Sequence, residues 1–335
     1  MIEPTDLQLF WAVVLGLSLL LYAVLDGFDL GVGILFGMTH EESSRRIMIR
    51  AVEPVWDGNE TWLLVAGAGL YAAFPTVYAI FFSALYLPVV LLLIALIFRG
   101  VAFEFRNRAT RHRGLWDQGF FLGSLAAAFV QGAAVGVLVD GIPVENGQFA
   151  GNAFSWLSPF SVLCGTGLVL AYTLHGAAWL VVKTGGNLRD RIYVRMPWLL
   201  AAAAVVFILV IAYAWMGQME ITRRWQDIGG FWWFPVLLFA ALAGFLLSLR
   251  KRRDHLLFLM SALVFITAFT SLLVSLYPYM IPFSVTISQG AASASALSFL
   301  FWGAGVIMLP VILLYTVIVY WVFRGRIETD EVQKY

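Results

Sequence analysis

The sequence predicts an all-α membrane protein with about nine transmembrane helices arranged in bundles, and three observations support this. Hydrophobic residues make up 61% of the chain and charged residues only 12%, with a mean hydropathy of +0.86. This composition is typical of an integral membrane protein and not of a soluble domain. Apolar segments long enough to cross a bilayer recur along the chain, and basic residues alternate between the connections that join them.

Nine segments contain the roughly 20 apolar residues that a membrane-spanning helix requires. The external connections between them carry Gly, Ser and Asn and are too short to fold alone, so we predict a single polytopic transmembrane domain over residues 1–335. The first apolar run is too long for a cleaved signal peptide, and acidic residues precede it. The predicted spans are residues 8–36, 48–72, 76–98, 116–138, 158–182, 197–216, 231–249, 256–277 and 299–323, and the longest external connections are residues 139–157, 217–230 and 278–298.

The distribution of basic residues predicts the orientation of the chain in the membrane. All but two of the 21 lysines and arginines fall in alternate connections, and only Arg223 and Arg224 fall on the opposite side. Under the positive-inside rule, this places the N-terminus outside and the C-terminus in the cytoplasm. The alternation is clean only if the number of spans is odd, as a nine-helix chain provides.

The composition also excludes several classes of function. The net charge is +1 and no basic stretch is interleaved with aromatic residues, so a nucleic-acid partner is not expected. The single cysteine, Cys164, excludes a disulfide framework and a thiolate metal cluster. Only His175 lies at membrane depth, and the chain has no Glu-x-x-His motif, so we predict no metal or haem iron bound by this chain. A single histidine of this kind is more often a hydrogen-bonded core residue.

Acidic residues inside two apolar segments are the strongest functional signal. Asp26 and Asp29 lie three residues apart late in the first span, and Asp57 and Glu60 repeat this spacing in the second. Glu53 precedes Asp57 by one helical turn. A charged residue at the centre of a membrane helix costs about 3 kcal/mol, so such residues usually handle ions or protons.

The predicted depths of these acids suggest a proton inlet. At 1.5 Å per residue, Asp26 and Asp29 lie roughly 10 to 15 Å from the cytoplasmic end of the first span. By the same rise, Asp57 and Glu60 lie about 15 to 20 Å inside the second. Desolvation raises the pKa of a carboxyl group in general, which allows it to take up and pass on protons near neutrality. The alternative is a fixed structural network in which the acids pair with Arg99 or Arg50.

Other residues near the acids have simpler interpretations. Gly27 to Gly31 and Gly33 to Gly37 form GxxxG patterns, which indicate close helix packing. Asn59 and Thr61 are expected to form hydrogen bonds within the bundle. Trp56 and Trp62 flank the acids and could line a cofactor.

Four motifs of the chain resemble subunit II of the cytochrome bd-type quinol oxidases, and their order and spacing fit this family from end to end. The connection between the sixth and seventh spans is compact, which resembles the cyanide-insensitive branch of the family. Shorter matches at Trp116-Asp117 and at Leu309–Thr316 agree. The four motifs are Asp26–Gly33 (DGFDLGVG), Arg45–Met48 (RRIM), Trp56–Leu63 (WDGNETWL) and Phe98–Arg106 (FRGVAFEFR).

The resemblance implies a heterodimer in the bacterial inner membrane with a haem-bearing subunit I, which holds two b-type haems and one d-type haem. Such a complex is a quinol:oxygen oxidoreductase and a translocase. It oxidises quinol, reduces dioxygen to water and builds a proton-motive force without pumping, because the protons come from the cytoplasm. Small single-span accessory subunits and membrane lipid are further expected partners.

The resemblance also assigns roles to residues of this chain. Asp57 matches the family's proposed proton-path carboxylate, and Asp26 and Asp29 match the aspartates of the first-helix motif. Arg99 matches the basic residue after the third span. No haem ligand is implied for this chain, which agrees with its lack of paired membrane histidines.

Two other functions remain open from the sequence. A proton- or cation-coupled secondary transporter would bind its coupling ion at the acids and would have broken helices around them. A purely structural subunit would stabilise its partner and take no part in proton transfer.

Overall fold

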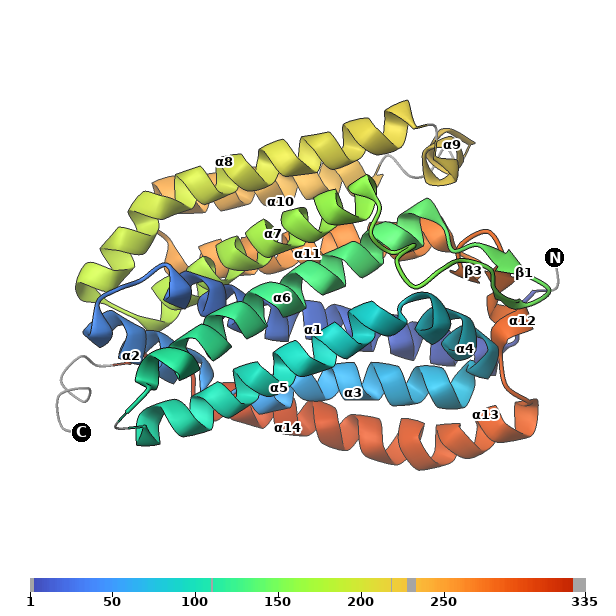
Figure 1. The fold of residues 1–335 in the computed structure, drawn as a ribbon, viewed down its shortest axis with the longest axis horizontal. Helices are drawn as coiled ribbons and strands as arrows, with labels where there is room; N and C mark the ends of the chain where they lie inside the picture. Colours follow the sequence, from blue (N-terminus) through green and yellow to red (C-terminus); the bar gives the residue numbers. More distant parts are fainter. Residues whose placement is uncertain (1–2, 110, 218, 228–232, 328–335) are drawn as a thin grey trace.

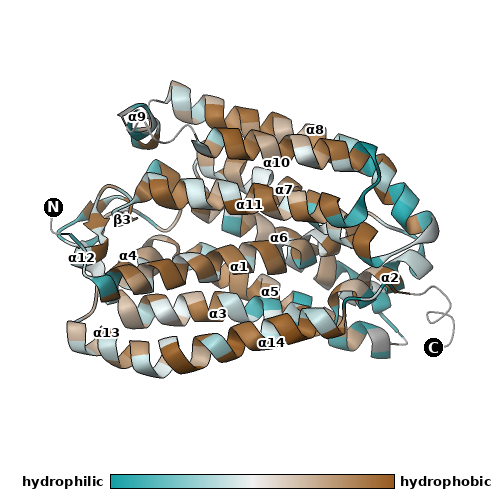
Figure 2. Ribbon diagram, turned by 180° about the vertical axis from the view of Figure 1, so that it is seen from behind, coloured by the Kyte–Doolittle hydropathy of each residue, from teal (hydrophilic) through white to brown (hydrophobic). Residues whose placement is uncertain are grey.

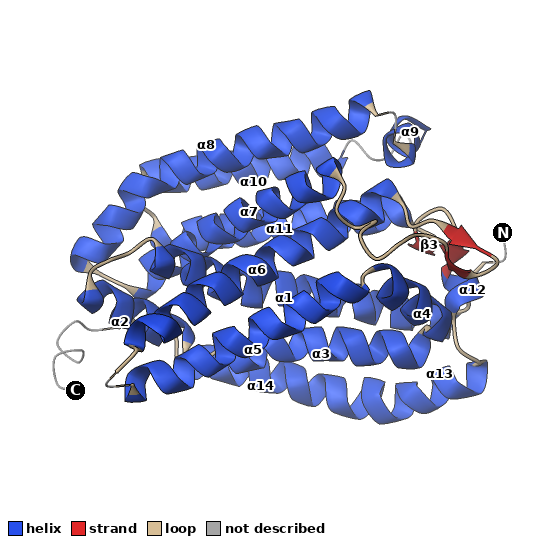
Figure 3. Cartoon of the chain, viewed as in Figure 1, coloured by secondary structure: helices blue, strands red, loops and turns tan. Residues whose placement is uncertain are grey.

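The computed structural model describes residues 3–109, 111–217, 219–227 and 233–327. Most of these residues are helical, and the long helices run roughly along one common axis as a single bundle (Figure 3). The all-α prediction is therefore confirmed. Part of the predicted connection 217–230, the first two residues of the predicted span 231–249, and Lys334 lie outside the described residues.

The helices and strands follow one another along the chain, and their labels appear in Figure 1. The first half contains α1 (Asp6–Gly37), α2 (Glu42–Val52), α3 (Trp56–Ala73), α4 (Pro75–Ala84), α5 (Tyr86–Arg108), α6 (Arg113–Asp140), β1 (Val144–Glu145) and β2 (Gln148–Phe149). The second half contains α7 (Pro159–Lys183), α8 (Gly186–Met216), α9 (Glu220–Asp227), α10 (Trp233–Arg250), α11 (Asp254–Leu276), β3 (Tyr279–Ile281), β4 (Val285–Thr286), α12 (Ile287–Gly290), α13 (Ala294–Leu300), the π-helix η1 (Phe301–Met308) and α14 (Leu309–Val322).

Eight helices in the described part of the chain are long and apolar enough to cross a membrane. They are α1, α5, α6, α7, α8, α10, α11 and the continuous segment Ala294–Val322 that combines α13, η1 and α14. The remaining predicted span, 48–72, contains α3, which packs against α1 and α14 inside the bundle. Its first turns hold Asp57, Asn59 and Glu60, and these polar residues lower its hydropathy below that of the other eight.

Two of the predicted spans are not continuous helices. The span predicted at 48–72 consists of α2 and α3, and the break falls at Pro54. Proline lacks an N–H donor and its ring clashes with the preceding helical turn, which explains this break. The span predicted at 76–98 consists of α4 and α5, and α5 extends ten residues further, to Arg108. Pro75 begins α4 and separates it from α3.

Helix α1 lies at the centre of the bundle and contacts α3, α6, α7 and α11. Its glycines allow unusually close approach. A Cβ atom added to Gly31 would lie 1.8 Å from the carbonyl oxygen of Tyr172, and one added to Gly176 would lie 2.5 Å from the carbonyl carbon of Gly31. The backbones of α1 and α7 are therefore in direct contact, which confirms the packing interpretation of the first GxxxG pattern.

The two ends of the bundle differ in chemistry. Hydrophilic residues gather around α2 and the neighbouring helix ends (Figure 2). The opposite end, near the N-terminus, carries the antiparallel hairpins β1–β2 and β3–β4. We call the end near α2 the arginine-rich end, because Arg45, Arg106 and Arg113 meet there.

Candidate functional site

A buried cluster of charged side chains joins three helices. Arg99 of α5 contacts Asp26 of α1, with 2.8 Å between Nη1 and Oδ1, and donates a hydrogen bond of 2.9 Å to Glu60 of α3. Asp26 and Arg99 have no exposed surface, whereas 27% of the Glu60 side chain is exposed. Arg99 lies nine residues before the end of α5, so the cluster is about 14 Å inside the bundle at 1.5 Å per residue.

Asn59 connects a third carboxylate to this region. Its side-chain nitrogen donates hydrogen bonds to Asp29, at 2.7 Å, and to the carbonyl oxygen of Leu25, at 3.2 Å. Its side-chain oxygen accepts a hydrogen bond of 2.9 Å from the hydroxyl group of Tyr320 on α14. Asn59 and Asp29 are both buried. The expectation that Asn59 forms hydrogen bonds within the bundle is confirmed.

Polar side chains continue from the cluster towards the opposite end of the bundle. Tyr22 precedes Asp26 by four residues on α1, so the two side chains share one helix face. Gln131 of α6 donates a hydrogen bond of 2.9 Å to the Tyr22 hydroxyl and accepts one of 3.1 Å from Tyr172 of α7. This chain of contacts was not predictable from sequence patterns, because isolated Tyr and Gln residues are ordinary in apolar helices.

The structure brings together four of the predicted site residues: Asp26, Asp29, Glu60 and Arg99. The interpretation of Arg99 as a residue that follows a span is wrong, because Arg99 lies within α5 and is fully buried. Pairing of the acids with Arg99, which was the structural alternative, is present. Arg99 pairs with the carboxyl groups of Asp26 and Glu60, whereas Asp29 is hydrogen-bonded to Asn59.

The other two predicted acids lie elsewhere. Asp57 is exposed in the first turn of α3, and Glu53 is exposed in the break between α2 and α3. The prediction that Asp57 lies 15 to 20 Å inside a continuous helix is wrong, because Pro54 interrupts that helix and α3 begins only at Trp56. Asp57 thus lies on the surface of this chain, between the arginine-rich end and the buried cluster.

The two flanking tryptophans are packing residues within this chain. Trp56 stacks on Phe103 with 5.2 Å between ring centroids, and Gly100 leaves space for its ring, since an added Cβ atom would lie 3.2 Å away. Trp62 is 1% exposed and belongs to the core. Both residues support α3 where it carries the acids.

His175 is held in the core by both of its ring nitrogens. Nδ1 lies 2.8 Å from the hydroxyl oxygen of Ser261 on α11, and Nε2 lies 2.9 Å from the carbonyl oxygen of Val24 on α1. The ring is fully buried and stacks on Phe258. These contacts do not fit an axial haem ligand, which needs one ring nitrogen free to bind iron. The interpretation of His175 as a hydrogen-bonded core residue is confirmed.

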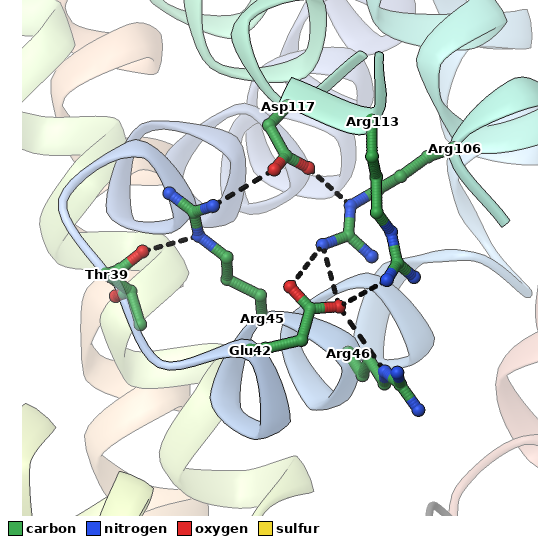
Figure 4. A network of polar contacts seen from close by, with 7 residues as sticks. All are labelled: Thr39, Glu42, Arg45, Arg46, Arg106, Arg113 and Asp117. Atoms are coloured by element: carbon green, nitrogen blue, oxygen red, sulfur yellow. Dashed lines mark hydrogen bonds and ion pairs between the residues drawn. The ribbon is translucent and has the colours of Figure 1, made fainter. Parts of the chain in front are cut away.

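A separate network of ion pairs closes the arginine-rich end (Figure 4). Glu42 of α2 pairs with Arg106 at 3.0 Å and with Arg113 at 3.0 Å, and accepts a hydrogen bond of 3.3 Å from Arg46. Asp117 of α6 accepts hydrogen bonds from Arg106, at 2.5 Å, and from Arg45, at 3.0 Å. This network fastens α2 to α5 and α6.

The pKa of Glu42 follows from these contacts. Partial burial alone would raise the pKa, but the charges of Arg106 and Arg113 and the hydrogen bonds from Arg46 and Arg106 lower it below its ordinary value. Glu42 therefore remains ionised at neutral pH and keeps its arginine partners in place.

Comparisons with known proteins identify relatives that span nearly the whole chain. Residues 7–323 match the family described as cytochrome bd terminal oxidase subunit II. The chain is 31% identical to cytochrome bd-I ubiquinol oxidase subunit 2 of Escherichia coli (strain K12), and the match covers 100% of this chain and 98% of that protein. It is 29% identical to cytochrome bd ubiquinol oxidase subunit 2 of Bacillus subtilis (strain 168), over 97% of this chain and 98% of that protein.

A solved structure shares the fold. One chain in the structure of bd oxidase from Geobacillus thermodenitrificans superimposes on this chain with a TM-score of 0.78 and 19% sequence identity. The match covers 95% of this chain and 99% of the other. The arrangement of helices described above is therefore that of a known membrane protein fold.

Proposed function

The chain belongs to the family of cytochrome bd terminal oxidase subunit II, and from this membership we propose that it is the haem-free subunit of a quinol oxidase in the bacterial inner membrane. Its partner, subunit I, binds two b-type haems and one d-type haem, oxidises quinol and reduces dioxygen to water. Small single-span subunits join the complex. The engagement of both ring nitrogens of His175 supports the assignment of all haem ligands to the partner.

We further propose that this chain supplies protons to its partner along α3. The observation that carries the proposal is the sequence of acids from an exposed Asp57, through a partly exposed Glu60, to the buried cluster around Arg99. Glu53 lies at the entrance, beside the arginine-rich end. Positive-inside orientation places this end in the cytoplasm, from which the protons for water formation are drawn.

The exposed face of α3 indicates where subunit I binds. Asp57, Leu64 and Tyr71 recur at seven-residue intervals and form one exposed stripe, with Leu64 70% and Tyr71 65% exposed. Glu60 lies beside this stripe. Exposing its charged carboxylate to lipid at this depth would cost about 3 kcal/mol. Covering the stripe with subunit I removes this contact and encloses the acids between the two subunits.

The charges around Arg99 suit proton transfer. Asp26, Asp29 and Glu60 lie near a single guanidinium group, and an unbalanced charge in a low-dielectric environment is strongly unfavourable. A bound proton neutralises a carboxylate that Arg99 does not balance. Asp57 takes up a proton at the surface, Glu60 receives it, and the Arg99 contact holds Glu60 in position for transfer to the partner.

The experiment uses the purified two-subunit complex with conservative variants. Asp57→Asn and Glu60→Gln keep side-chain volume and remove the titratable group. We expect both variants to retain their haem spectra. Quinol-driven oxygen consumption and proton uptake into vesicles should fall by about a hundredfold or more, as expected for the loss of one proton-transfer group. Asp190→Asn is the matched control, because Asp190 is an exposed acid on α8 that pairs with Arg252 outside this path. Unchanged turnover in both fully assembled variants would rule out the inlet.

A purely structural role remains a second candidate for part of the cluster. The complete burial of Asp26 and Arg99 favours it, because such a pair cannot exchange protons directly with water. Asp26→Asn distinguishes the two roles. Loss of assembled complex indicates a structural residue, whereas slow turnover with intact haems indicates a member of the proton path.

A further inference from the structure

A cavity of about 270 Å³ opens at the arginine-rich end, apart from the acid cluster. It lies where the end of α1 and the connection to α2 face α7 and the first turns of α8. Its inner wall is apolar and is formed by Leu35, Met48, Ala177, Ile192 and Leu199. The proton path described above uses none of these residues.

The rim of the cavity is positively charged. Arg191 and Arg195 lie four residues apart on α8 and therefore on the same helix face, and His40 and Glu41 face them from the connection between α1 and α2. Arg191 forms an ion pair with Glu41. Hydrogen bonds from Ser43 and from Arg191 lower the pKa of Glu41, so this carboxylate stays ionised and balances Arg191.

Arg195 is left with its charge unbalanced. It forms no ion pair with any acid in the described part of the chain, and its side chain is exposed at the rim. Unlike Arg191, it is free to bind an anion. A guanidinium group presents two parallel N–H donors, which match the oxygen atoms of a phosphate group.

The rim lies at the boundary between water and lipid. Trp198 follows Arg195 by three residues on α8 and is 78% exposed, as expected of an interfacial tryptophan. Beyond it, α8 presents exposed apolar side chains, including Val205 and Ile208. A lipid with its phosphate group at Arg195 thus has an apolar cavity on one side and an apolar helix surface on the other.

We propose that this cavity is a binding site for one anionic phospholipid, with its phosphate group on Arg195 and an acyl chain in the apolar interior. Basic pockets between transmembrane helices on the cytoplasmic side bind such headgroups. The cavity is slightly smaller than the roughly 300 to 1,000 Å³ of pockets for drug-sized ligands, so it holds part of one chain and the remainder lies along α8. The unbalanced charge of Arg195 favours an anionic headgroup over one that carries its own ammonium group.

The test measures lipid retention by the intact complex. Wild-type complex, Arg195→Gln and Leu199→Trp are each reconstituted in nanodiscs that contain phosphatidylglycerol or phosphatidylcholine, extracted into mild detergent, and analysed by native mass spectrometry. Leu199→Trp fills the cavity without removing a charge. Arg250→Gln is the matched control, because Arg250 is an exposed arginine at the end of α10, outside the cavity. The haem spectrum verifies assembly of each variant.

We expect wild type and the control to retain one phosphatidylglycerol molecule. Arg195→Gln should bind it at least about tenfold more weakly, as the loss of a charge-assisted hydrogen bond implies. Leu199→Trp should also bind it more weakly, because the indole ring occupies the space of the acyl chain. The proposal would be overturned by equal retention of phosphatidylglycerol by wild type and Arg195→Gln, or by equal retention of phosphatidylcholine and phosphatidylglycerol by wild type. Recovery of quinone in place of phospholipid would overturn it too. Displacement of phosphatidylglycerol by millimolar inorganic phosphate would also overturn it, because it would show a site for the free anion alone.

Discussion

Arg99 and Asp26 form a fully buried ion pair, with 2.8 Å between Nη1 of the guanidinium group and Oδ1 of the carboxylate. The two residues come from α5 and α1, and the second nitrogen of Arg99 donates to Glu60 of α3. One side chain thus links three helices. Burying each charge is expensive, and the pair is stable only while both partners are present.

Replacing Arg99 by Gln should therefore destabilise the complex strongly. The change leaves Asp26 buried without a counterion, and loss of one partner of a buried pair costs about 3 to 5 kcal/mol. The yield of assembled complex and its thermal unfolding measure the effect. Arg108→Gln on the same helix is the control, because Arg108 is 78% exposed and its pair with Glu104 is worth no more than about 1 kcal/mol. Equal stability of the two variants would contradict the role given to Arg99.

Gly31 should not tolerate even a methyl group. A Cβ atom at this position would lie 1.8 Å from the carbonyl oxygen of Tyr172, so Gly31→Ala must separate α1 from α7. We expect a loss of about 1 to 3 kcal/mol or more, as for overpacked cores, seen as a lower unfolding temperature. Gly67→Ala on α3 is the comparison, since nothing lies within 4 Å of its added Cβ atom. That variant should be neutral or more stable, because alanine favours helix.

His175→Ala should leave every haem in place. The change removes hydrogen bonds to Ser261 and to the Val24 carbonyl group, which leaves buried polar atoms unpaired and costs about 1 to 3 kcal/mol. A lower unfolding temperature with an unchanged haem absorption spectrum is the expected result. An assembled variant that lacks one haem would show instead that His175 binds iron.

Acidification should loosen the arginine-rich end through Glu42. Its folded-state pKa is lowered, so the stabilisation that it provides is present above its unfolded pKa of about 4.5 and is lost as the pH falls through the lower folded value. Glu42 is 41% exposed, so solvent screening limits the effect to about 1 kcal/mol. Unfolding temperatures measured from pH 6 down to pH 3 should fall for wild type. Glu42→Gln should have a lower unfolding temperature than wild type at pH 6 and a smaller decrease between pH 6 and pH 3. An equal decrease in both proteins would contradict the role given to Glu42.

The predicted acids show which features of the site can be predicted from sequence patterns and which cannot. Apolar surroundings made Asp26, Asp29 and Glu60 conspicuous, because charge in a membrane helix is rare whatever the fold. The sequence left pairing of these acids with Arg99 open as an alternative, but it placed Arg99 beyond the end of a span and so did not predict its depth. Only the full length of α5, which continues to Arg108, places it at the level of the acids. Tyr22, Gln131 and Tyr172 gave no signal, because their hydrogen bonds join three separate helices.

By itself, the sequence determined the membrane class, the family and the acids that define the site. These properties depend on local composition and spacing, which do not change with the arrangement of the helices. Tertiary structure alone decided that Asp57 lies on the surface, that Arg99 balances Asp26, and that an apolar cavity lies under Arg195. Each of these depends on where helices distant in sequence meet, and that is set by backbone contacts such as Gly31 with Tyr172 and by the break at Pro54.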